Sequence, residues 1–149
     1  MKSTSNIALR TVLILAGAFT AFTGFNIAFG GISTLGWQGV SAFFEVTNEH
    51  AFLIQDSHVR FLGGVWIGAG LLFLLAATDV RKYRHALNVV LALIVLGGFA
   101  RLTQLHPAVT FGPDVIGSLI AELVGIPVLY WWLSKAVAPA AHGQRVAAA

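Results

Sequence analysis

Four charged residues lie inside apolar stretches of this sequence, where a charge is costly. Asp56 and Arg60 lie four residues apart in QDSHVRFLGGVWIGAG (residues 55–70), and Arg101 and Glu122 lie in two later apolar runs. A spacing of four places Asp56 and Arg60 on one face of a helix, where a carboxylate and a guanidinium group can pair. Such residues can form ion pairs, or an arginine can hold a bound carboxylate or phosphate.

Glu122 has the greatest need of a partner. It lies eight residues after Asp114 (122 − 114), roughly 12 Å into its apolar run, and its short side chain cannot reach the membrane surface from there. We expect Glu122 to pair with Arg101, which reaches the same depth in the preceding run, with Arg60 and Gln104 as the next candidates. The alternative for each arginine is that its long side chain extends to the lipid headgroups.

Two roles fit these side chains. The formal charges of Asp56, Arg60, Arg101 and Glu122 sum to zero, which favours a compensated network that holds the helices in one register. If Glu122 is neutral, the arginines carry surplus positive charge toward the outer leaflet, where an anionic headgroup or a small carboxylate would fit. The candidate ligand-binding residues are Arg60, Arg101, Glu122, Asp56, His58 and Gln104.

Other chemistry has little support in the sequence. His50 and His106 reach His58 only through predicted loops, so we expect no metal site. The chain has no cysteine, which excludes disulfides and thiolate chemistry. No nucleotide fingerprint or catalytic constellation is present, so we expect no cofactor and a protein that is not an enzyme. The alternative is a subunit of a membrane enzyme or transporter in which Glu122 or His58 carries protons.

The composition identifies a membrane protein. Hydrophobic residues make up 57% of the 149 residues and charged residues 10%, and the mean hydropathy is +0.82; soluble domains carry far more charge. We predict an all-α, antiparallel four-helix transmembrane bundle that forms a single domain over residues 1–149, with a cytoplasmic tail over residues 134–149. The predicted helices cover residues 8–29, 58–78, 86–105 and 114–133, each close to the roughly 20 residues that cross a bilayer.

Two segments allow alternatives. The loop from Gly30 to Gln55 contains WQGVSAFFEV, whose aromatic residues recur at helical spacing, so it forms either a short interfacial helix or a packed loop. Lys2 and Arg10 precede the apolar run of the first helix, as in a cleaved signal peptide, but this run reaches full spanning length, which favours a retained helix. Glycine and alanine recur at helical spacing in the predicted helices, as in helices that pack closely in lipid.

The flanking charges predict the orientation. Successive helices cross the membrane in opposite directions, so their ends alternate between its two sides. The ends on one side carry acidic residues, which are Glu45, Glu49, Asp56 and Asp114. The ends on the other side carry basic residues, which are Lys2, Arg10, Arg81, Lys82, Arg84, Lys135 and Arg145. The positive-inside rule then places both termini in the cytoplasm. This asymmetry explains the basic pI of 9.8, so we expect no nucleic-acid partner. The expected partners are membrane lipids and a larger membrane complex.

The motifs around these residues resemble a known family. DSHVRFLGGVWIGAG, LGGFARL and AELVGIPVL are similar to the pattern of a family of small four-helix bacterial membrane proteins catalogued as a domain of unknown function. The resemblance covers about residues 7–132 and implies that the polar signature of the family is Asp56, His58, Arg60, Arg101 and Glu122. The family has no assigned activity, so the resemblance implies no reaction. We expect the protein to lie in a bacterial inner membrane. A more distant similarity to the DoxX-like group suggests a link to respiratory or redox membranes.

Overall fold

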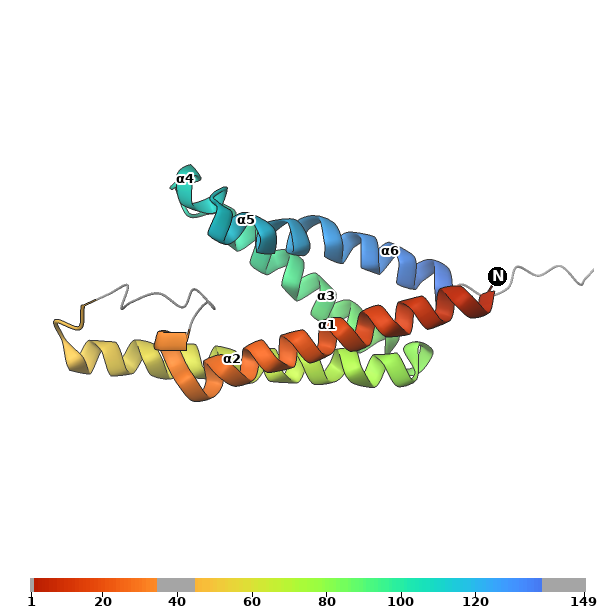
Figure 1. The fold of residues 1–149 in the computed structure, drawn as a ribbon, viewed down its shortest axis with the longest axis horizontal. Helices are drawn as coiled ribbons and strands as arrows, with labels where there is room; N and C mark the ends of the chain where they lie inside the picture. The colour runs from red at the N-terminus through yellow and green to blue at the C-terminus, as the bar shows by residue number, and fades with distance from the viewer. Residues whose placement is uncertain (1, 35–44, 138–149) are drawn as a thin grey trace, which may run out of the picture. The chain divides into compact units, whose positions relative to one another are not determined.

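The fold is described from a computed structural model of the chain, in which residues 2–34 and 45–137 are described (Figure 1). These residues fall into two compact units. The first unit contains residues 10–79, and the second contains residues 80–137 together with residues 2–9. Every regular element in the described ranges is helical.

The first unit is a hairpin of two long helices. Helix α1 (Lys2–Gly30) leads into a 3-10 turn, η1 (Gly31–Thr34), and helix α2 (Glu49–Thr78) returns antiparallel to α1 (Figure 1). The side chain of Asn48 accepts a 3.0 Å hydrogen bond from the backbone N–H of Ala51 and caps the start of α2. This cap satisfies one of the backbone donors that a helix leaves unpaired at its first turn.

Glycines let the backbones of α1 and α2 approach closely. A methyl group at Gly63 would lie 2.7 Å from Cα of Ala28, and one at Gly24 would lie 2.6 Å from the backbone nitrogen of Ile67. Both distances are shorter than any normal carbon contact, so only glycine fits. A methyl group at the adjacent Gly64 would meet no atom within 4 Å. One line of glycines on α2 therefore packs against α1, as small residues do in lipid, and the next line faces outward.

The second unit is a hairpin whose returning helix is interrupted. Helix α3 (Val80–Leu102) is followed by the single turn α4 (Pro107–Thr110). The returning helix consists of α5 (Pro113–Ile120), a π-helical turn η2 (Ala121–Gly125) and α6 (Ile126–Val137) (Figure 1). Both α4 and α5 begin with proline, whose fixed φ suits the first position of a helix.

Four helices are long and apolar enough to cross a membrane. They are Ile7–Gly30, Glu49–Thr78, Val80–Leu102 and Pro113–Ala136, with mean hydropathies between 1.6 and 2.0. Large apolar side chains on them are exposed, for example Phe61 at 70% and Leu96 at 61%, which suits a lipid environment and would be unfavourable in water. The predicted all-α fold with four membrane helices is confirmed.

Three predicted helix starts are wrong. Helix α1 begins at Lys2 instead of Ala8. Helix α2 begins at Glu49 instead of His58, so the last residues of the predicted outer loop are helical, and α3 begins at Val80 instead of Ala86, so Asp79 alone separates α2 from α3. The reason is that an apolar run marks only the part of a helix inside hydrocarbon, whereas the hydrogen-bonded backbone continues into the polar interface. At about 1.5 Å per residue, the 30 residues of α2 span about 45 Å, beyond the roughly 30 Å of hydrocarbon.

The other helix ends differ less. Helix α3 ends at Leu102 instead of Leu105, and α6 continues to Val137 instead of ending at Leu133. The aromatic part of the outer loop, where an interfacial helix was one alternative, lies in residues 35–44, outside the described residues. Most of the predicted tail, residues 138–149, also lies outside them. The assignment of the whole chain to a single domain stays a prediction.

Candidate functional site

The predicted pair of Arg101 and Glu122 forms in the second unit. The Arg101 Nε atom donates to both carboxylate oxygens of Glu122, at 2.9 Å to Oε2 and 3.2 Å to Oε1, and its Nη2 atom donates to Oε1 at 3.1 Å. One edge of the guanidinium group thus grips the carboxylate in the two-pronged arrangement that favours arginine over lysine. Arg101 also lies in the last turn of α3, where the helix dipole favours a cation.

Small and irregular backbone features bring the two side chains together. A methyl group at Gly98 would lie 3.0 Å from Cβ of Glu122 and 2.8 Å from Cδ2 of Leu123, so α3 approaches the returning helix closely one turn before Arg101. Glu122 lies in the π turn η2, whose wider ring ends with the Ile126 N–H donating to the Ala121 carbonyl. Such turns are rare and occur frequently at functional sites.

The two partners differ sharply in exposure. The side chain of Glu122 is 10% exposed, and that of Arg101 is 42% exposed. All three hydrogen bonds from Arg101 to Glu122 use its Nε and Nη2 atoms. Among the described residues, none accepts a hydrogen bond from its Nη1 atom. A methyl group at Gly97, one turn before Arg101, would meet no atom within 4 Å. Glu122 therefore holds one edge of the guanidinium group while the Arg101 side chain remains 42% exposed.

The predicted pair of Asp56 and Arg60 forms in the first unit, with additional partners. The Arg60 Nε atom lies 2.6 Å from Oδ2 of Asp56, and Nη1 donates to the carbonyl oxygens of Phe29 at 2.7 Å and Ala28 at 3.4 Å. These carbonyls belong to the last turn of α1, where helical backbone acceptors lack partners. Arg60 thus satisfies the end of α1, so its contacts hold the hairpin together.

Asp56 fixes the turn that follows α1. Its Oδ1 atom accepts a 2.7 Å hydrogen bond from the backbone N–H of Ile32 in η1. Gly31 has a φ of +71°, which non-glycine residues adopt at a cost of roughly 1–2 kcal/mol, and a Cβ atom there would collide with Oδ1 of Asp56. Asp56 lies inside α2, seven residues after Glu49 (56 − 49), and the residue that caps the start of this helix is Asn48.

The remaining predicted site residues do not join either pair. Gln104 follows the end of α3, and only its backbone takes part in the hydrogen bonds between described residues: its N–H donates to the Arg101 carbonyl, and its carbonyl accepts from Thr110 Oγ1 at 3.4 Å. His58 is exposed and lies on a different face of α2 from Asp56. The described geometry therefore gives one ion pair in each unit.

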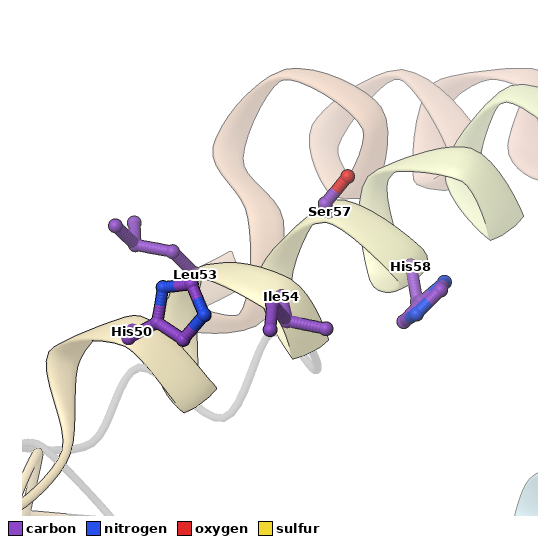
Figure 2. A pocket seen from close by; sticks show the side chains of 5 residues that line it. All are labelled: His50, Leu53, Ile54, Ser57 and His58. Carbon is purple, nitrogen blue, oxygen red and sulfur yellow. The ribbon is translucent and has the colours of Figure 1, made fainter.

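His58 lines a shallow groove of about 310 Å³ on α2 (Figure 2). The lining residues recur at the spacing of one helix face and are His50, Leu53, Ile54, Ser57 and His58. His50 and His58 lie eight residues apart, about 12 Å along the helix, too far to share one metal ion. Within the described ranges, no group of three or more histidine or acidic residues could hold a metal.

Sequence reasoning missed three features of these sites. It did not foresee the bonds from Arg60 to the end of α1, the hydrogen bond from Ile32 to Asp56, or the π turn at Glu122. The only sequence signal for the π turn is Pro127, which lacks the N–H that would continue a regular helix. The groove on α2 had no signal, because it begins in residues that were expected to form a loop.

Comparison with known proteins gives a family and no function. The model of a family described as "Domain of unknown function (DUF4345)" matches residues 8–133. No curated protein and no solved structure matches the chain. The matched range contains both ion pairs and all six candidate site residues.

Proposed function

The chain belongs to the family described as a domain of unknown function (DUF4345), as the resemblance in its motifs predicted. We propose that this member of the family is a non-enzymatic membrane protein that binds an anion at Arg101. The anion is a small carboxylate or the phosphate of a lipid headgroup. Arg101 is the binding residue, and Glu122 is the positioning residue that holds its guanidinium group in place.

The open edge of Arg101 is the observation that supports this proposal. Glu122 is almost completely buried and uses Nε and Nη2, which orients the guanidinium plane, while Nη1 has no partner among the described residues. An arginine that only extended toward headgroups would be free to change rotamer; this one is held in a fixed orientation before any ligand arrives, which lowers the entropic cost of binding. Arg60 is a weaker candidate, because its Nε and Nη1 atoms already bond Asp56 and α1.

The matched substitutions Arg101→Lys and Arg60→Lys test the anion site. We expect phosphate, acetate or short-chain phosphatidylglycerol to raise the melting temperature of the native protein in neutral detergent, because a ligand that binds only the folded state stabilises it. Arg101→Lys should abolish the shift with phosphate or acetate and reduce the shift with phosphatidylglycerol, since lysine cannot reproduce the planar fork. Arg60→Lys should retain both shifts on a lower baseline. Phosphatidylcholine serves as the control lipid.

Each outcome of this experiment has a defined meaning. A shift with phosphatidylglycerol alone identifies a lipid headgroup as the ligand, and a shift with phosphate or acetate identifies a soluble anion. An equal shift in the native protein and Arg101→Lys, or no shift with any anion, would reject the site and leave the pair with a structural role. The alternative of a proton-carrying subunit that uses Glu122 or His58 stays a prediction, as does membership of a larger complex.

The proposed orientation places both termini in the cytoplasm of a bacterial inner membrane. It rests on the basic residues near the termini and around the connection of α2 to α3, and on the acidic residues near Asn48. Because the chain has no cysteine, single cysteines at Arg84, Gln144 and Asn48 can be labelled without background. We expect an impermeant maleimide added to intact cells to label only Asn48→Cys. Labelling of the cysteines at positions 84 and 144, and not of the cysteine at position 48, would show the opposite orientation and contradict the proposal.

A further inference from the structure

Basic side chains gather at one end of the second unit. Arg81, Lys82 and Arg84 lie in the first turns of α3, and Lys135 lies in the last turn of α6. Arg81, Lys82 and Lys135 are exposed, and Arg84 is half-buried. Asp79, which precedes α3, is the acidic residue nearest to Arg81, Lys82 and Arg84 in the sequence. We call Arg81, Lys82, Arg84 and Lys135 the basic end.

The antiparallel arrangement of the hairpin brings the two helix ends to one level. Gly98 of α3 lies beside Glu122 of the returning helix, where a Cβ on the glycine would be 3.0 Å from Cβ of Glu122. On α3, His85 lies thirteen residues before Gly98 (98 − 85). On the returning helix, Lys135 lies thirteen residues after Glu122 (135 − 122). Because both helices rise about 1.5 Å per residue, Lys135 lies level with the first turns of α3.

Exposed aromatic residues show where the membrane surface lies relative to this end. Tyr130 and Trp131 are 49% and 61% exposed, and they lie about one turn before Lys135, on the side of the apolar centre of the helix. The Lys82 ammonium lies 5.2 Å from the ring centroid of Tyr83. Tyrosine and tryptophan rings favour the boundary between hydrocarbon and headgroups, so cations one turn farther along lie at the depth of the phosphates.

We propose that the basic end is a binding surface for anionic phospholipids, with the headgroup phosphate as the group that it recognises. Basic residues at this depth attract anionic lipid with about 1 kcal/mol each, or roughly fivefold in affinity. The aromatic residues favour a lipid over a soluble phosphate, because they hold the surface in the headgroup layer of a bilayer. The surface lies at the opposite end of α3 from Arg101 and does not depend on the anion site proposed there.

Quenching of tryptophan fluorescence by brominated lipids tests this surface when Trp37 and Trp66 are replaced with phenylalanine in every protein compared, because the two remaining tryptophans, Trp131 and Trp132, lie next to it. The full chain is reconstituted in phosphatidylcholine vesicles that contain increasing amounts of brominated phosphatidylglycerol or, as a control, brominated phosphatidylcholine. We expect the native protein to prefer phosphatidylglycerol and to lose this preference as salt is added, because screening weakens surface charge interactions. The triple variant Arg81→Gln, Lys82→Gln, Arg84→Gln should lose the preference roughly hundredfold, at about fivefold per charge.

Matched variants keep the experiment decisive. The double variant Arg81→Lys, Arg84→Lys preserves the charge and should behave as the native protein does. If the triple variant does not fold, Lys135→Gln alone should lower the preference about fivefold. The proposal fails if the neutral variants keep the native preference, if the preference is insensitive to salt, or if soluble phosphate displaces the lipid. Lipid bound at Arg101 lies at the other end of α3 from Trp131 and Trp132, so quenching of these two residues reports on the basic end, and the melting-temperature experiment with phosphate or acetate measures binding at Arg101 separately.

Discussion

Replacement of Arg101 with glutamine should lower the free energy of unfolding by about 3 kcal/mol, measured in mixed micelles by denaturant titration. The substitution leaves Glu122, with a side chain only 10% exposed, as a buried carboxylate without its cation, and loss of one partner from a buried pair typically costs about 3–5 kcal/mol. Glu122→Gln should cost less, about 1–2 kcal/mol. The released guanidinium group, already 42% exposed, can extend toward water.

The double variant Arg101→Gln, Glu122→Gln separates a direct pair from two independent effects. We expect its loss of stability to be smaller than the sum of the two single losses, because the second substitution removes the charge that the first left unpaired. Additive losses would contradict a direct contact. Equal losses in the two single variants would contradict the asymmetry that the difference in burial predicts.

Replacement of Gly63 with alanine should have the second large effect, at the contact between α1 and α2. Its Cβ would collide with the backbone nitrogen of Ala28 and lie 2.8 Å from the carbonyl carbon of Ile27. Backbone atoms cannot move aside as a side chain can, so the two helices must separate. Overpacking of this kind costs about 1–3 kcal/mol, and we expect the upper end of that range or a failure to fold.

The neighbouring glycine is the control for this substitution. Gly64→Ala adds the same methyl group one residue along α2, where nothing lies within 4 Å. It should leave stability unchanged or raise it by up to about 1 kcal/mol, because alanine favours a helix over glycine. The melting temperatures of both variants are measured in detergent. A value well below that of the native protein for Gly63→Ala, and a value at or above it for Gly64→Ala, would support the packing described. Equal effects at the two positions would contradict it.

The sequence was sufficient to predict the helices and both ion pairs. Long apolar runs can only be membrane helices, since lipid leaves backbone groups no other partners. A carboxylate as deep as Glu122 must find a cation, and Arg101 is the nearest at that depth in the neighbouring run. Asp56 and Arg60 required only the four-residue spacing of one helix face. These inferences worked because each depends on local chemistry and on depth in the membrane.

The features that were missed depend on contacts between distant parts of the chain or on polar helical turns. Arg60 reaches Phe29 and Asp56 reaches Ile32 only because the hairpin returns there, and composition does not encode that register. The first turns of α2 contain Glu49, Gln55 and Asp56 among apolar residues, so hydropathy underestimates the helix. In this respect the capping side chain of Asn48 was the better signal for the helix start.

The position of the Asp56–Arg60 pair on α2 limits the thickness of the hydrocarbon layer that α2 can cross with the pair at the polar boundary. From Arg60 to Thr78, at the end of the helix, there are 18 residues (78 − 60), or about 27 Å of helix. Tilting shortens this span, so the charged pair remains at the polar boundary only where the hydrocarbon layer is about 27 Å or thinner. In thick sterol-rich membranes, at roughly 32–33 Å, the lipid must thin around α2 or the pair must enter hydrocarbon. We therefore expect α2 to fit a thin bilayer better than a thick one.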